Sequence, residues 1–102
     1  MSTPDRHTEV LLGDHQDERL SPAGRAIGLT IDECSAIRRH AMRLESIGSW
    51  ALALEAYRMA AIVDPTQSSN WFGLARCYRH VGDVITAERV ELCASIIQEK
   101  MS

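Results

Sequence analysis

The sequence predicts an all-α domain of four helices, arranged as two consecutive helical hairpins. Apolar residues recur at steps of three and four in four segments between Thr30 and Glu99, which is the spacing of one face of an α-helix. Gly or Pro residues separate these segments, and both residue types commonly end helices. The apolar share comes mainly from Ala, Leu and Ile, and aromatic residues make up only 5% of the chain. This mixture favours closely packed helices over a β-sandwich.

The first hairpin is predicted between Thr30 and Pro65. Thr30 and Glu33 have the spacing of a capping box, in which each side chain accepts a hydrogen bond from the other residue's backbone N–H. Gly48 is expected to end this helix and Ser49 to cap the next one. Pro65 ends the second helix, because its ring disfavours helical geometry in the preceding residue. The expected core faces are Ile37, Ala41, Leu44 and Ile47 in the first helix and Ala53, Ala56, Tyr57, Ala60 and Val63 in the second.

The second hairpin is predicted to repeat this pattern. Gly82 ends the third helix, and Asp83 is placed to cap the fourth. The expected core faces are Trp71, Leu74, Ala75 and Tyr78 in the third helix and Val84, Ala87, Val90, Ala94 and Ile97 in the fourth. Residues 30–102 therefore form the expected helical domain.

Residues 1–29 are predicted to form a flexible N-terminal arm. This segment contains five acidic and three basic residues together with Pro and Gly, a composition that favours a mobile chain. Within it, Ser21–Pro22 has a Ser suited to the N-cap and a Pro suited to the first helical position. This pair favours the start of a short helix.

The charge and the cysteine content argue against several function classes. The net charge is −3, whereas nucleic-acid binding requires a basic surface to offset phosphate charge. No apolar run approaches the roughly 18 residues that suggest membrane insertion. The cysteines (Cys34, Cys77 and Cys93) are odd in number and lack CxxC spacing, which favours reduced thiols packed as small apolar side chains. With the polar start of the chain, these features predict a cytoplasmic protein.

Residues 34 positions apart match one another along the two hairpins. The matched pairs are Ala41 with Ala75, Gly48 with Gly82, Ala53 with Ala87 and Ala60 with Ala94. This spacing resembles the tetratricopeptide repeat, in which small residues let two helices approach and Gly permits the turn between them. The resemblance implies two tandem repeats, at 34–67 and 68–101. Glu91 and Glu99 depart from it, because the repeat usually has an aromatic residue and Pro there. The alternative is an unrelated antiparallel four-helix bundle with this Ala spacing by chance.

Two shorter stretches resemble a narrower group, the chaperones of bacterial type III secretion. Gly28–Leu29, Asp32, Ile37 and Ala41 are similar to the approach to the first repeat in the class II chaperones, which hold translocator subunits. Residues 71–75, Trp-Phe-Gly-Leu-Ala, are similar to the start of their next repeat. Those chaperones usually have a third repeat, and the tetratricopeptide-like chaperones of needle subunits are nearer to this chain in length. The resemblance implies a chaperone that keeps an exported subunit soluble. It leaves open whether that subunit is a translocator or a needle subunit.

The tetratricopeptide resemblance also implies a protein-binding surface. The first helix of each repeat lines the concave wall of such arrays. The positions that usually face a ligand include Arg38, Met42 and Glu45 in the first repeat and Phe72, Arg76 and Arg79 in the second. Cations beside soft apolar side chains suit an amphipathic segment with acidic flanks. In the alternative interpretation, Arg38 and Arg79 are solvated charges paired with Glu45 or Glu33, and Phe72 packs internally.

The number of repeats predicts a further contact. Solenoids usually need about three repeats to bury a continuous core, so two repeats leave apolar faces open, where Trp50, Leu52, Ile96 and Ile97 are expected. We therefore expect a homodimer or a heterodimer with a protein partner. The alternative function is a general adaptor or scaffold that joins two folded proteins.

No sequence pattern predicts catalysis, a cofactor or a metal site. The chain has no HExxH motif and no Gly-rich phosphate loop. His7, Asp14, His15, Asp17 and Glu18 lie in the predicted mobile arm, whereas metal ligands need fixed geometry. We therefore expect a non-enzymatic binding module.

Overall fold

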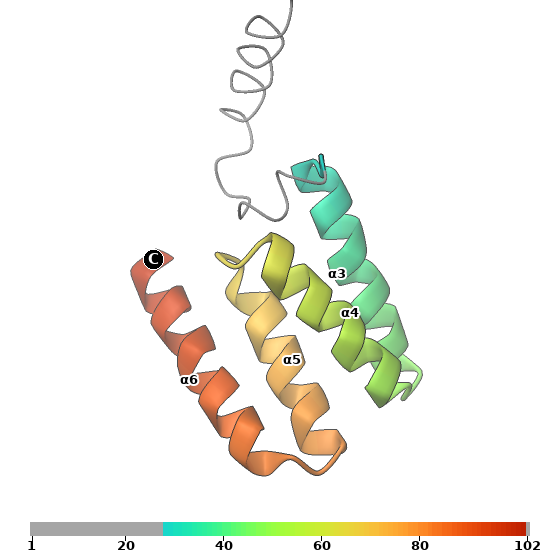
Figure 1. Cartoon of the computed structure of the whole chain (residues 1–102), viewed down its shortest axis with the longest axis vertical. Helices are drawn as coiled ribbons and strands as arrows, with labels where there is room; N and C mark the ends of the chain where they lie inside the picture. The colour runs from blue at the N-terminus through green and yellow to red at the C-terminus, as the bar shows by residue number, and fades with distance from the viewer. Residues whose placement is uncertain (1–27, 102) are drawn as a thin grey trace, which may run out of the picture.

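The computed structural model describes residues 28–101 and contains four helices within that range (Figure 1). They are α3 (Ile31–Ser46), α4 (Trp50–Val63), α5 (Ser68–His80) and α6 (Val84–Met101). No strand occurs in this part of the chain, and the prediction of an all-α fold is confirmed. Except for Gly28 and Leu29, the predicted arm lies outside the described residues, as does its expected helix at Ser21–Pro22.

The ends of the helices follow the local sequence signals closely. The Thr30 side chain accepts a hydrogen bond from the Glu33 N–H at 3.1 Å, and the Glu33 carboxylate accepts one from the Thr30 N–H at 2.9 Å. The capping box at the start of α3 is thus confirmed. Gly48 and Gly82 follow α3 and α5 with φ of 77° and 93°, a left-handed conformation in which only Gly avoids a steric penalty. Ser49 occupies the N-cap position of α4 without a side-chain hydrogen bond.

The helices pack in chain order. α3 contacts α4, α4 contacts α5 and α5 contacts α6, while α3 also touches α5. Figure 1 shows α6 and α3 at opposite ends of this row. The points of closest approach are occupied by alanines that are at most 1% exposed, namely Ala41, Ala53, Ala60, Ala75, Ala87 and Ala94. A methyl side chain lets two helix backbones approach at each crossing, and larger residues (Leu54, Tyr57 and Leu74) fill the space between them.

The connection between α4 and α5 is fixed by two polar side chains of α5. Asn70 is 2% exposed, and its Nδ2 donates to the backbone oxygens of Ala60 and Asp64, each at 3.2 Å. The Trp71 indole Nε1 donates to the backbone oxygen of Pro65 at 2.8 Å. These bonds tie the start of α5 to backbone oxygens at the end of α4 and in the turn that follows it.

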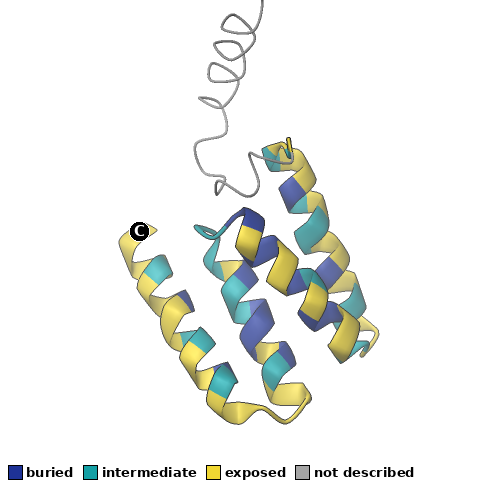
Figure 2. Cartoon of the chain, viewed as in Figure 1, coloured by how far each residue is buried: buried dark blue, intermediate teal, exposed yellow. Residues whose placement is uncertain are grey.

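Exposure is uneven along the row of helices. In Figure 2 the buried positions concentrate on α4 and α5, whereas most of α6 is exposed. Leu52 and Ile96 are 61% and 47% exposed, as expected. Trp50 is partly covered because its ring stacks on His80, with ring centroids 3.5 Å apart. The prediction of a packed thiol at Cys93 is wrong, because no described helix covers that side of α6.

Candidate functional site

An open groove of about 610 Å³ runs across the faces of α3 and α5 toward the end of α6. Its lining consists of Arg38, Met42, Tyr57, Gln67, Ser68, Ser69, Phe72, Arg76 and Gln98. Four of the six residues expected to face a ligand are among them: Arg38, Met42, Phe72 and Arg76. Two helices distant in sequence thus bring the predicted cations and apolar side chains to one hollow. That they bind a protein stays a prediction.

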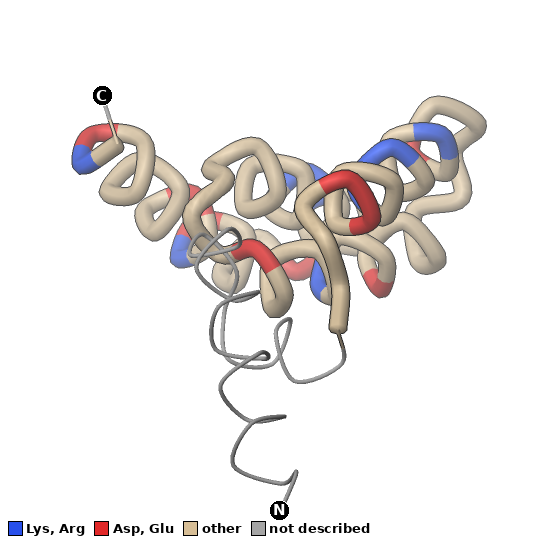
Figure 3. Tube along the Cα trace, turned by 90° about the horizontal axis from the view of Figure 1, so that it is seen from above, with Lys and Arg blue, Asp and Glu red and all other residues tan. Residues whose placement is uncertain are grey.

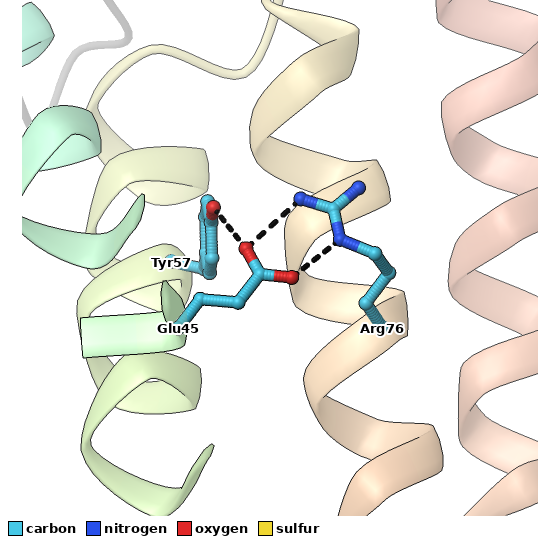
Figure 4. Close-up of polar contacts among 3 residues, drawn as sticks. All are labelled: Glu45, Tyr57 and Arg76. Carbon is cyan, nitrogen blue, oxygen red and sulfur yellow. Dashed lines mark hydrogen bonds and ion pairs between the residues drawn. The ribbon is translucent and has the colours of Figure 1, made fainter. Parts of the chain in front are cut away.

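The floor of the groove is built on a polar cluster that joins three helices (Figure 4). Glu45 of α3 accepts a hydrogen bond from the Tyr57 hydroxyl of α4 at 2.7 Å. The Arg76 guanidinium of α5 donates to both carboxylate oxygens of Glu45, through Nε at 2.5 Å and Nη2 at 3.0 Å. Such a bidentate ion pair fixes the orientation of the guanidinium and of the carboxylate. The Glu45 side chain is only 16% exposed, so it supports Arg76 from beneath instead of lining the groove.

Electrostatics keep each member of this cluster in one protonation state near neutral pH. The hydrogen bonds from Arg76 hold the pKa of the Glu45 carboxyl below its ordinary value of 4.5. Burial, together with the neighbouring carboxylate, raises the pKa of the Tyr57 phenol. The contact with Glu45 also raises the pKa of Arg76. A carboxylate, a neutral phenol and a guanidinium therefore persist together. This stable pattern suits positioning rather than proton transfer.

Tyr57 reaches Glu45 because the facing residue on α5 is Gly73. A Cβ atom built at Gly73 would lie 2.3 Å from Cε1 of the Tyr57 ring, well inside van der Waals contact. The Tyr57 ring is 1% exposed, and its hydroxyl is directed past Gly73 into the carboxylate. The absent side chain at Gly73 is thus a structural requirement for the cluster.

Arg79 lies away from the groove. Its guanidinium donates to both oxygens of Glu91 on α6, through Nε at 2.9 Å and Nη2 at 2.6 Å. The alternative interpretation named Glu45 or Glu33 as the partner of Arg79, whereas the partner in the structure is Glu91. Arg38 makes no ion pair with any residue between 28 and 101. Of the two arginines that line the groove, Arg76 is paired with Glu45, and Arg38 has no such partner within the described range.

Several lining residues were missed by sequence reasoning. Tyr57 was expected only in the core, Gln67 comes from the turn before α5, and Ser68 is the first residue of α5. Gln98 comes from the last turns of α6, so its place depends on how α6 crosses α5. None of the lining residues is His, Cys, Asp or Glu, and Cys77 beneath them is buried, which raises its thiol pKa to about 11. The groove therefore offers cations, amides, hydroxyls and apolar surface for binding.

Charges elsewhere on the described residues are mixed in sign. Figure 3 shows acidic and basic residues interspersed along the helices, and no extended basic face appears in this view. Between residues 28 and 101, no helix combines the length and apolar character required to cross a membrane. The same part of the chain contains no cluster of three or more His, Cys, Asp or Glu side chains suited to a metal ion.

A second, smaller hollow of about 190 Å³ is lined by residues of α4, α5 and α6 and shares no lining residue with the groove. Its lining is mainly apolar and consists of Arg58, Ala61, Ile62, Trp71, Leu74, Tyr78 and Val90. The only charged lining residue, Arg58, already pairs with Glu55 at 3.3 Å. This hollow lacks the free cation that distinguishes the larger groove.

No protein-family model, curated protein or solved structure matches the chain. Its function is therefore inferred from the groove and from the residues that line it.

Proposed function

We propose that the chain is a non-enzymatic protein-binding module that holds a segment of a partner protein in the groove between α3 and α5. One observation carries this proposal: the groove sets Arg38, which has no ion pair with residues 28–101, beside the apolar side chains of Met42 and Phe72. A guanidinium next to soft apolar surface suits a segment with apolar anchors and an acidic flank. The Ser and Gln residues at the edges add hydrogen-bonding groups.

We further propose that the fold is a pair of tetratricopeptide-like repeats. The helices pack in chain order with α3 touching α5, as stacked hairpins do. Alanines 34 residues apart are buried in both hairpins, as in Ala53 with Ala87 and Ala60 with Ala94. Gly48 and Gly82 take the same left-handed conformation at matching turns. A closed four-helix bundle would instead pack its first helix against its last.

The proposed biological role is that of a type III secretion chaperone, which shields an apolar segment of an exported subunit until export. Its support is the resemblance at residues 28–41 and 71–75, together with a groove of suitable chemistry. The alternative role is a general adaptor that joins two folded proteins. Both roles require the same groove but predict different effects on the partner, since a chaperone protects an otherwise insoluble chain.

Co-expression tests the role and the site together. A small exported subunit encoded beside this protein is produced alone, with the wild-type chain, and with the double variant Arg38→Glu/Phe72→Ala. A chaperone is expected to raise the soluble yield of the subunit, and the double variant is expected to lose that effect. The matched control is Arg39→Glu, since Arg39 is an exposed neighbour outside the groove lining. An unchanged yield with bound subunit would favour the adaptor, and full protection by the double variant would exclude the groove.

A further inference from the structure

One face of α6 carries large apolar side chains that no described helix covers. α6 packs on α5 through Ala87 and Ala94, both 0% exposed. On the opposite side of the helix lie Ile85, Leu92 and Ile96, which are 66%, 63% and 47% exposed. At 3.6 residues per turn these three residues form one line, which we call the α6 seam. Apolar side chains gathered on one exposed face mark an interaction surface.

Charged residues flank the α6 seam, with one sign on each side. The same helical periodicity places Glu88 and Glu99 along the edge that also carries Gln98, on the side of the groove. It places Arg89 and Lys100 along the other edge. All four charged residues are exposed. The outer face of α6 is therefore an apolar line with an acidic border and a basic border.

We infer that a second copy of this chain docks on the α6 seam, with the two α6 helices parallel and related by a two-fold axis along their length. A two-fold interface uses one surface twice, so that surface has to be complementary to itself. In the parallel arrangement, each residue of the α6 seam lies at the same level along the two-fold axis as the same residue of the second copy. The acidic border of each copy then faces the basic border of the other, with Glu88 of one copy near Arg89 of the second copy.

The separation of acidic and basic residues onto opposite borders of the α6 seam favours the parallel arrangement over the antiparallel one. In an antiparallel pair the two-fold axis crosses the helices, so each border meets the same border of the second copy. Glu88 would then face Glu99 of the second copy, and Arg89 would face Lys100 of the second copy. Like charges opposite one another oppose association. Apolar burial along the seam is common to both arrangements, whereas only the parallel one pairs opposite charges.

Sedimentation velocity of the full chain over a range of concentrations tests the association. The wild type is expected to show a monomer–dimer equilibrium, and Leu92→Glu to raise the dimer Kd by about tenfold or more. The matched control is Leu52→Glu, an equally exposed apolar residue on α4, which is expected to leave the Kd unchanged. A wild type that stays monomeric up to its solubility limit, or a control that raises the Kd as much as Leu92→Glu, overturns the inference.

Charge exchange tests the pairing across the seam. Glu88→Arg and Arg89→Glu are each expected to weaken the dimer, and the double variant Glu88→Arg/Arg89→Glu to restore it, because the exchanged borders are again complementary. In an antiparallel dimer Glu88→Arg would instead strengthen association, because it would face Glu99 of the second copy. That result would contradict the parallel arrangement.

Oxidative cross-linking tests the orientation directly. In a Cys93→Ser background, Ile85→Cys is expected to form a disulfide between two copies. Residue 85 lies on the α6 seam, so in the parallel dimer it faces residue 85 of the second copy. Val84→Cys is the control, since Val84 is 46% exposed but lies off the seam. Cross-linking at residue 85 and not at residue 84 supports the parallel dimer. Absence of the residue 85 cross-link in a sample that sedimentation shows to be dimeric overturns it.

Discussion

Gly73 lies directly against the ring of Tyr57, and a Cβ atom there would approach Cε1 to 2.3 Å. This contact joins the packing of α4 and α5 to the polar cluster, because the same ring carries the hydroxyl that donates to Glu45. The base of the groove therefore depends on a missing side chain. Adding a side chain at residue 73 would therefore disturb the core and the groove together.

Gly73→Ala is expected to destabilise the fold by about 1–3 kcal/mol, the usual range for an overpacked core. The added methyl group has to displace the Tyr57 ring, which is 1% exposed. Chemical denaturation followed by circular dichroism measures the change. The double variant Gly73→Ala/Tyr57→Leu provides the control, since a smaller side chain at residue 57 relieves the clash. Its stability should exceed the value obtained by adding the two single effects.

The ion pair between Arg76 and Glu45 is expected to contribute to stability as well as to binding. Arg76→Met removes the guanidinium and leaves a carboxylate whose side chain is only 16% exposed. The expected loss is about 1–3 kcal/mol, the usual effect of leaving a buried polar group without a partner. Arg58→Met is the matched control, because Arg58 pairs with Glu55 on the surface, where both side chains are more than half exposed. Its effect should stay below about 1 kcal/mol.

Glu45 is expected to make the fold less stable in acid. Its pKa is lower in the folded state than the ordinary 4.5, chiefly because of Arg76. The unfolded chain therefore takes up the proton first as the pH falls. The stabilising effect is complete above about pH 4.5 and is lost as the pH drops through the lowered folded value. Denaturation midpoints measured through this range should fall more steeply for the wild type than for Glu45→Gln. Parallel profiles of the two proteins would contradict the prediction.

The three cysteines are expected to differ sharply in reactivity. Cys93 is exposed on α6, whereas Cys34 and Cys77 are buried, and burial raises the pKa of the Cys77 thiol to about 11. The thiolate is the nucleophile that attacks a disulfide reagent, so the reaction needs both a deprotonated sulfur and access to it. Titration of the native protein with a disulfide reagent at neutral pH should therefore show one fast thiol among the described cysteines. Cys93→Ser should remove the fast phase, and denaturant should expose the two slow thiols.

The parts of the fold set by local chemistry were predictable from the sequence. Thr30 with Glu33, and the turns at Gly48 and Gly82, depend on residues within a few positions of one another. Contacts between side chains of different helices were harder to predict from the sequence. Glu45 and Arg76 are 31 residues apart, and their pairing depends on how far two long side chains reach across α3 and α5.

The same limit explains the error at Cys93. A free cysteine usually packs as a small apolar side chain, but burial on α6 depends on which neighbour covers each side of the helix. Only the side facing α5 is covered, so Ala87 and Ala94 are buried and Cys93 is exposed. For the groove, the tetratricopeptide resemblance pointed to Arg38 and Met42 on α3, and both line it. The resemblance gave no signal for Gln98, which depends on the crossing of α6 over α5.

Arg38 is expected to control the affinity of the groove for anionic apolar molecules. The probe is 8-anilinonaphthalene-1-sulfonate, which combines an aromatic body with a sulfonate and fluoresces when it leaves water. Its rings suit Phe72 and Met42, and its sulfonate suits the Arg38 guanidinium, which has no ion pair in the described part of the chain. Arg38→Glu should weaken binding by about tenfold, equivalent to about 1.4 kcal/mol, as measured by fluorescence titration. Arg39→Glu changes the net charge equally but lies outside the lining, so it should bind like the wild type. Equal losses in both variants would mean that overall charge, and not the groove, attracts the probe.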